Sequence, residues 1–213
     1  MDGSPSFDDG FFERLRDLIA WRRDVRRFRD EPVAPELIDE LIALACLSPS
    51  VGNSQPWRFV KVADPDRRRK VVRNFEASNR AALTDYEGER AKLYAGLKLA
   101  GLKEAPVHLA VFCDRETLRG HGLGQRTMPE TVDYSVVAAT QTLWLAARAR
   151  GLGVGWVSIL DPAAVTADLD VPDDWALIAY LCIGYPEEEH ADPELVRHGW
   201  QDRAAIKDFV LDR

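Results

Sequence analysis

Four arginines within six residues give this sequence its most distinctive chemistry. The segment reads Arg22-Arg23-Asp24-Val25-Arg26-Arg27. Each guanidinium presents a planar fork of N–H donors that can hold phosphate oxygens in pairs. We therefore expect a local site for a phosphate-bearing ligand, although a solvated basic turn with weak surface ion pairs would have the same composition.

Asp24 is the exception in this cluster, because a carboxylate repels a phosphate. Two interpretations follow from the sequence. The side chain either forms a structural ion pair with a neighbouring arginine, or acts as an acid or base beside the bound anion. The second role requires hydrogen-bonding distance to the reacting atom, which the sequence does not show.

A second polar segment, residues 48–56, has Ser50, Asn53 and Gln55 between two prolines. An ordinary turn from a helix into a strand uses the same residue types. Amide side chains also donate and accept hydrogen bonds at once, as a polyhydroxylated chain or the edge of a heterocycle requires. We favour a ligand-binding loop.

The glycine-rich run over residues 151–155 looks superficially like a dinucleotide-binding fingerprint. It leads from a predicted helix into a predicted strand, whereas the fingerprint leads from a strand into a helix. The glycines are therefore expected to end the helix and to let the strand pass close to a ligand. Ser158, near the end of that strand, is either a site residue or a simple strand-end hydrogen-bonding group.

Charge and composition restrict the classes of partner. The chain has 213 residues, 35 acidic and 28 basic side chains, and a net charge of −7. Nucleic acid and anionic membrane would repel such a protein at long range, so neither is expected as a partner. Isolated cysteines in apolar runs predict a reduced, cytoplasmic protein. The scattered histidines predict no metal site.

Hydrophobic periodicity predicts the elements that must position these residues. The expected helices cover residues 11–21, 35–47, 65–94 and 132–150, and the expected strands cover 58–62, 107–113, 153–159 and 176–185. Residues 115–130 contain several glycines and few apolar side chains, which is typical of a long surface loop. One α+β domain over residues 1–213 is the simplest organisation.

Four separated motifs occur in the order found in one known family. They are RRDVRRF from residue 22, SPSVGNSQPW from residue 48, the helix over 132–150, and GLGVGWVSILDP from residue 151. Over residues 11–210 the chain resembles the nitroreductase-like FMN-binding family. Aspartate at position 24, with residues 126–130 and 156–158, makes it most similar to the aerobic 5,6-dimethylbenzimidazole synthase branch.

The resemblance implies a fold and an assembly. The fold would be α+β, with a central mixed sheet of four to five strands flanked by helices. Two chains would form an intertwined homodimer with FMN at the subunit interface. Segments near residues 86–102 and 115–130 would form a lid over the flavin.

The resemblance also implies roles for individual residues. Asp24 would act as acid or base, and Ser158 would orient or relay a proton. The residues expected to contact FMN are Arg22, Arg23, Val25, Arg26, Ser50, Asn53, Gln55, Leu99 and Arg203. Of these, Arg22, Arg23 and Arg26 would hold the phosphate and ribityl end, with Arg203 as a helper.

The activity implied by the resemblance is the O2-dependent fragmentation of reduced FMN to 5,6-dimethylbenzimidazole and erythrose 4-phosphate, which supplies the lower ligand of vitamin B12. FMN would be the substrate and O2 the co-substrate, and a separate flavin reductase is a candidate partner. Two alternatives stay open. One is an NAD(P)H-dependent FMN reductase or nitroreductase with resident FMN, and the other is a non-catalytic flavin-binding module.

Overall fold

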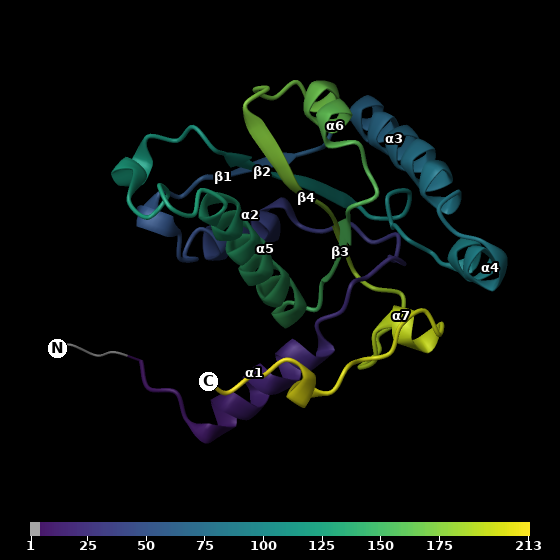
Figure 1. Cartoon of the computed structure of the whole chain (residues 1–213), viewed down its shortest axis with the longest axis horizontal. Helices are drawn as coiled ribbons and strands as arrows, with labels where there is room; N and C mark the ends of the chain where they lie inside the picture. Colours follow the sequence, from purple (N-terminus) through teal and green to yellow (C-terminus); the bar gives the residue numbers. More distant parts are fainter. Residues whose placement is uncertain (1–4) are drawn as a thin grey trace.

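A computed structural model describes residues 5–213 and shows an antiparallel sheet between two layers of helices (Figure 1). The strands are β1 (Trp57–Lys61), β2 (Val107–Asp114), β3 (Gly153–Val157) and β4 (Trp175–Gly184). Their order across the sheet is β1-β2-β4-β3, and all three neighbouring pairs are antiparallel.

The expected α+β class and the strand number are confirmed within the described residues, but the expected mixed sheet is wrong for these four strands. The parallel pairing that the structure contains is an isolated bridge between Asp24 and Val154. It adds a short piece of chain to the β3 edge without forming a fifth full strand.

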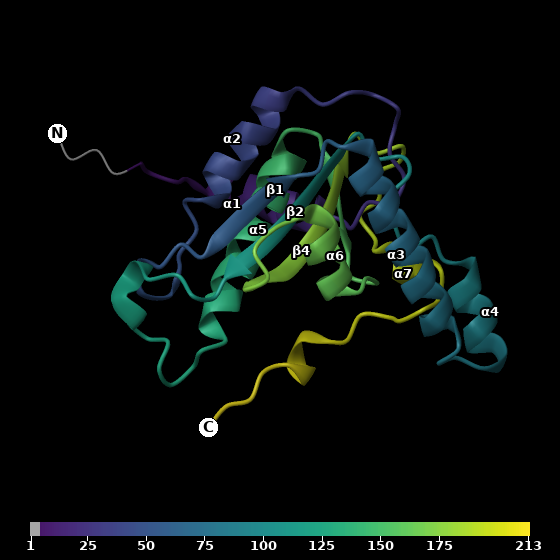
Figure 2. The ribbon, with the colours of Figure 1, turned by 90° about the horizontal axis from the view of Figure 1, so that it is seen from above.

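Seven α-helices lie in the described part of the chain. They are α1 (Asp9–Trp21), α2 (Pro35–Ala45), α3 (Pro65–Leu83), α4 (Gly88–Gly96), α5 (Thr131–Ala149), α6 (Pro162–Leu169) and α7 (Glu194–Arg197). Short 3-10 turns cover Val51–Asn53, Arg119–Gly122 and Ile206–Asp208. Helices α2 and α5 cover one face of the sheet, and α3 and α6 cover the other (Figure 2).

Alternation along the strands builds a separate apolar core on each face. In β2, Leu109 and Val111 pack with α2 and α5, whereas Ala110 and Phe112 pack with α3 and α6. Successive side chains of a strand point to opposite faces, so a strand buried on both faces is apolar at every position. This explains the continuous apolar runs that predicted β2 and β4.

The helix expected over residues 65–94 is in fact two helices. It stops at Leu83, where the Thr84 hydroxyl donates to the Ala81 carbonyl at 2.6 Å, and α4 starts at Gly88 with φ of +57°. Helix α6 was not expected, although Asp161 caps it by accepting from the Ala163 and Ala164 N–H groups. Its eight residues are too few for periodicity to stand out.

Helix α1 lies outside the layered body (Figure 1) and buries none of its residues. The apolar side predicted for it is largely exposed, with Phe12 at 63% and Ile19 at 50%. The C-terminal segment also exposes apolar side chains, since Phe209 and Leu211 are 74% and 76% exposed. A single chain therefore leaves substantial apolar surface at both ends without cover.

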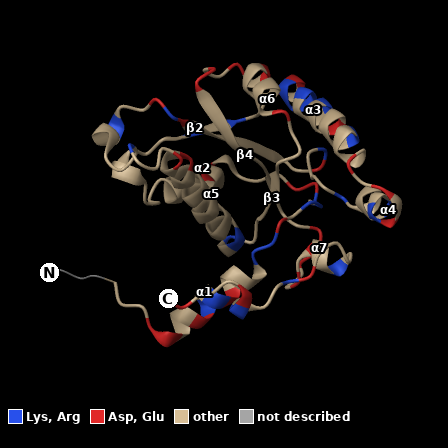
Figure 3. Cartoon of the chain, viewed as in Figure 1, with Lys and Arg blue, Asp and Glu red and all other residues tan. Residues whose placement is uncertain are grey.

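Charges avoid the middle of α5. Figure 3 shows basic and acidic residues mixed along α1, α3 and α4, whereas α5 carries Asp133 in its first turn and Arg148 in its last. The exposed side of α5 includes Tyr134 and Val137. None of the helices described over residues 5–213 is both long enough and apolar enough to cross a membrane.

His108 is buried in the core between the sheet and α3 and α6. Its ring Nδ1 lies 2.9 Å from the Tyr180 hydroxyl, and the residue is 1% exposed. Burial, together with the nearby Arg68 charge, lowers the pKa of His108 from 6.5 to about 4. The imidazole is therefore neutral in the folded protein at neutral pH.

We predict that His108 makes the protein less stable as the pH falls from about 6.5 towards 4. The unfolded chain binds a proton at this histidine in that range and the folded chain does not, so acid favours unfolding. The depressed pKa corresponds to about 3 kcal/mol of unfolding free energy. Urea unfolding of the wild type and His108→Gln from pH 7 to pH 4 measures the difference. Parallel pH dependences of the two proteins would contradict it.

Candidate functional site

The arginine segment is fixed along the free edge of β3. The Val25 N–H donates to the Val154 carbonyl at 3.0 Å. Two residues further along β3, the Trp156 N–H donates to the Asp24 side chain at 2.8 Å. Backbone pairing thus places the Asp24 carboxylate at a defined position on the strand.

Two glycines of β3 make this close approach feasible. A Cβ on Gly155 would lie 2.2 Å from the Val25 carbonyl oxygen, and one on Gly153 would lie 2.7 Å from the Val25 side chain. The close approach expected at this strand is therefore to the chain's own arginine segment. The expectation that these glycines end the preceding helix is confirmed, since Gly151 follows α5 with φ of +75°.

Asp24 is paired and half-buried, with its side chain 30% exposed. Arg26 Nε lies 2.8 Å from one carboxylate oxygen, and the Trp156 N–H binds the other. Burial is the largest effect and raises the pKa of Asp24, while the Arg26 charge and the Trp156 hydrogen bond lower it. The geometry therefore contains the structural ion pair, and the opposing electrostatic effects are the kind found at acid–base groups.

Two of the expected phosphate-binding arginines already have partners within the chain. Besides Asp24, Arg26 binds the Lys98 carbonyl at 3.0 Å, and its side chain is 11% exposed. Arg23 donates through Nε to the Ala191 carbonyl at 2.7 Å. Their guanidiniums stabilise the walls of the site.

Arg22 and Arg203 remain as the groups that best suit an anion. Arg22 lies over the Trp144 ring at 4.8 Å, and its buried Nε has no hydrogen-bond partner among residues 5–213. Burial lowers the pKa values of Arg22 and Arg23, and the charge of Arg203 lowers both further. Three guanidiniums close enough to repel one another, one with an unsatisfied donor, fit a bound phosphate.

Other expected residues lie near this cluster. Leu99 follows Lys98, whose carbonyl accepts from Arg26, and Ser158 comes directly after β3, two residues beyond Trp156. Trp144 of α5, which was not among the expected site residues, donates its indole N–H to the Arg23 carbonyl at 3.3 Å. No pattern in the sequence distinguished Trp144 from the other tryptophans.

The polar loop is tightly self-bonded. The Gln55 N–H donates to the Ser50 hydroxyl at 3.1 Å, and the Gln55 amide donates to the Asn53 carbonyl at 3.3 Å. Asn53 and Gln55 both have positive φ, 55° and 47°. Such left-handed conformations at non-glycine residues cost free energy and cluster at functional sites, which supports a ligand loop.

The structure does not bring the loop and the arginine segment together in one chain. The Val51 N–H binds Ser135 of α5 at 3.0 Å, and Ser48 binds Thr142 of the same helix at 2.7 Å. The arginine segment instead contacts Trp144, about 200° around the helix from Thr142. The loop also leads into β1 and the segment lines β3, which are opposite edges of the sheet, ~14 Å apart.

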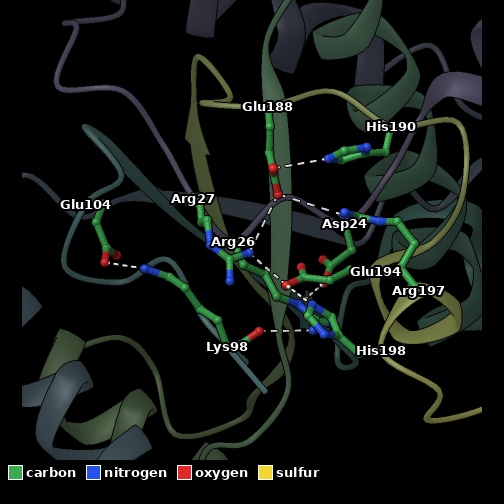
Figure 4. A network of polar contacts seen from close by, with 10 residues as sticks. All are labelled: Asp24, Arg26, Arg27, Lys98, Glu104, Glu188, His190, Glu194, Arg197 and His198. Carbon is green, nitrogen blue, oxygen red and sulfur yellow. Dashed lines mark hydrogen bonds and ion pairs between the residues drawn. The ribbon is translucent and has the colours of Figure 1, made fainter. Parts of the chain in front are cut away.

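A small polar cavity of about 40 Å³ is lined by Asp24. The residues that line it come from the arginine segment and from residues 188–197, and Figure 4 shows several of them. Arg27 Nη1 binds Glu194 at 2.7 Å, and Glu194 lies 3.7 Å from His198. Nothing in the sequence singled out Glu194, because its contact with Arg27 spans 167 residues.

Comparisons with known proteins show the family to which the chain belongs. The model of the Nitroreductase family matches residues 19–185. A protein of Rhodospirillum rubrum named 5,6-dimethylbenzimidazole synthase is 61% identical over 95% of this chain and 96% of its own length. A protein of the same name from Rhodobacter capsulatus is 48% identical over 92% of this chain and 95% of its own length.

Solved structures are similar in fold. Iodotyrosine deiodinase, determined with FMN and 3-iodo-L-tyrosine, is 28% identical with a TM-score of 0.70, covering 83% of this chain and 91% of that one. A putative nitroreductase from Desulfovibrio desulfuricans, determined with FMN, has a TM-score of 0.67 at 22% identity, covering 98% of both chains. The second likeness is one of fold alone.

We predict that Gly155→Ala separates the arginine segment from β3. The new methyl group would meet the Val25 carbonyl oxygen, which is backbone and cannot move aside. The expected loss of unfolding free energy is about 1–3 kcal/mol, together with loss of flavin binding. Urea unfolding and flavin fluorescence titration measure the two effects.

Gly96→Ala in α4 is the control for that substitution. Its Cβ would have no atom within 4 Å, so stability should stay within about 0.5 kcal/mol. Equal behaviour of the two variants would show that the contact between Val25 and Gly155 does not limit stability or binding.

Proposed function

We propose that this chain, which belongs to the nitroreductase family, is an enzyme that converts reduced FMN and O2 into 5,6-dimethylbenzimidazole and a four-carbon sugar phosphate, erythrose 4-phosphate. The product would serve as the lower ligand of vitamin B12. The observation that carries the proposal is a carboxylate, Asp24, fixed beside an arginine cluster suited to the phosphate of the substrate. The full-length likeness to relatives named for this product supports it.

The arginine cluster orients the substrate in this scheme. Arg22 and Arg203 bind the phosphate, while Arg23 and Arg26 hold the chain around it. Anchoring the phosphate end places the ribityl chain along β3. Asp24 is bound there to the Trp156 N–H, and Ser158 lies two residues further along the chain. Reduced FMN supplies the carbon skeleton and the electrons for the reaction with O2.

Asp24 acts as the acid–base group. As a carboxylate it accepts a proton from the ribityl carbon attached to the ring, which stays with the ring when the four-carbon fragment leaves. Burial raises its pKa and so strengthens it as a base. The Trp156 N–H and Arg26 hold the carboxylate in one orientation. Ser158 orients a proton near the ring.

A second copy of the chain would complete the site. Ser50, Asn53 and Gln55 lie across α5 from the arginine segment, so a flavin bound by one chain's arginines meets the polar loop of another chain. The exposed apolar faces of α1 and the C-terminal segment are the surfaces that such a homodimer would cover. We infer a homodimer with two composite sites.

Residues 115–130 are positioned to close the site from the side of the polar loop. The carbonyl of Gly52 lies so close to Gly120 that a Cβ on Gly120 would be 2.5 Å from it. This contact joins the expected lid to the expected ligand loop. Together, residues 115–130 and 86–102 would exclude bulk water from the site. Exclusion matters because water would otherwise intercept the oxygenated flavin before it fragments.

We predict that the purified protein, given reduced FMN in air, forms 5,6-dimethylbenzimidazole, which mass spectrometry detects. Asp24→Asn should bind FMN with the wild-type affinity and form product at least about 100-fold more slowly, because the amide cannot accept the proton. Flavin fluorescence titration and single-turnover product analysis measure the two quantities separately.

Recovery of intact oxidised FMN alone would contradict the synthase. If NAD(P)H were consumed at the same time, the result would favour a flavin reductase or nitroreductase with resident FMN. If neither the flavin nor NAD(P)H changed, the result would favour a non-catalytic flavin-binding module.

We predict that two inactive variants restore activity when mixed into heterodimers. Asp24→Asn damages the arginine half of both sites, and Asn53→Ala damages the loop half. In a heterodimer carrying one substitution per chain, one composite site has both substitutions and the other has neither. Co-expressed, doubly tagged heterodimers should therefore regain about half the activity per dimer, since one of two sites is intact.

Asp24→Asn mixed with a second Asp24 variant is the control, because no arrangement of those chains gives an intact site. A monomer in sedimentation equilibrium, or heterodimers without activity, would contradict the composite site.

A further inference from the structure

An acid–base group that is covered while it reacts needs a route by which its proton reaches solvent. Asp24 receives a proton on the side that faces the substrate, and a closed lid would leave that side dry. Asp24 also lines the polar cavity of about 40 Å³. Such a volume can hold about three water molecules.

Glu194 shares that cavity with Asp24. Its side chain is 9% exposed, and one oxygen accepts from Arg27 Nη1 at 2.7 Å. Figure 4 shows the Glu194 and Asp24 carboxylates close to one another, between Arg26 and Arg27. His198 lies 3.7 Å from Glu194, and its side chain is 45% exposed. Glu194 thus shares the cavity with Asp24, whose side chain is 30% exposed in a single chain, and contacts His198, which is open to solvent.

We infer that Glu194 is a proton-relay residue that connects Asp24 to solvent through this cavity, with His198 at the outer end. The inference rests on the proposed function, because it gives Asp24 a proton to pass on. Glu194 acts through Asp24 and does not touch substrate, so it is a positioning residue rather than a catalytic one.

The transfer balances without any further reactant. Protonated Asp24 gives its proton to Glu194 through water in the cavity and returns to the carboxylate. Glu194 passes the proton to an imidazole nitrogen of His198, which releases it to bulk water. No electrons leave the chain, and each group ends in its starting state.

The charges around the route allow a single mobile proton. Asp24 is faced by Arg26, by Arg22, by the Trp156 N–H and by Glu194. Glu194 is faced by Arg27, His198 and Asp24. The remaining charged or titratable groups that line the cavity are Arg23, Glu188, His190, Asp192 and Arg197. Arginines thus balance the two carboxylates, and a shared proton does not leave an uncompensated charge.

We predict that Glu194→Gln lowers the rate of product formation about tenfold while FMN affinity stays unchanged. The amide still accepts from Arg27, so the fold is kept, but it cannot carry a proton. Loss of the negative charge of Glu194 also lowers the pKa of Asp24. The acid limb of the pH–rate profile should therefore move to lower pH.

Glu189→Gln is the matched control. Glu189 lies on the same segment and pairs with an arginine, Arg148, at 3.0 Å, but it does not line the cavity. It should leave both the rate and the pH profile unchanged. A Glu194→Gln enzyme with the wild-type rate and pH profile would overturn the inference.

His198→Gln tests the outer end of the route without disturbing the pair between Arg27 and Glu194. Its rate should fall in dilute buffer and recover when imidazole is added, since small bases can replace the lost proton carrier. A rate equal to that of the wild type and independent of imidazole would remove His198 from the route.

A measurement that does not depend on product separates this inference from the proposed function. The Asp24 carboxyl can be titrated by 13C NMR, with Asp24→Asn to assign its signal. In Glu194→Gln its pKa should be lower than in the wild type. An unchanged Asp24 pKa overturns the inference whichever reaction the wild type performs, whereas absence of dimethylbenzimidazole from the wild type overturns the proposed function.

Discussion

The backbone pairing between Val25 and the edge of β3 is the interaction on which the site depends. It consists of a hydrogen bond to the Val154 carbonyl and a contact with Gly155 that leaves no space for a Cβ. Through it, the N–H of Trp156 faces the Asp24 carboxylate, and the arginines on either side of Asp24 are turned in different directions. An edge strand has unpaired backbone groups available, and here they position the Asp24 carboxylate.

The two interpretations of Asp24 turn out to be compatible. Its ion pair with Arg26 is structural, in that it offsets part of the cost of burying a carboxylate. Burial still exceeds the effect of that pair and raises the pKa of Asp24. An aspartate that is hydrogen-bonded through both oxygens, has a raised pKa and lies beside an arginine cluster has the properties that proton transfer requires.

Helix α5 separates the two groups of expected site residues within one chain. Across the proposed homodimer, the same helix would bring them together. Within one chain it keeps the polar loop on one side and the arginine segment on the other. Its side chains between Asp133 and Arg148 carry no charge, and its exposed surface includes Tyr134 and Val137. In the proposed homodimer, two such helices would bring the loop of one chain to the arginines of the other.

The sequence alone determined which chemical groups are present and which elements carry them. Periodicity gave β2, β4 and most of α5, because burial on both faces or along one helix face leaves a pattern in neighbouring residues. The cluster at residues 22–27 was equally visible, since its members are adjacent. Only the tertiary structure decided that Arg26 pairs with Asp24, that Arg203 approaches Arg22, and that Glu194 reaches Arg27. The last two pairs join the first 30 residues to the last 20. Residues so far apart in sequence leave no local pattern, because their proximity depends on how the whole chain folds.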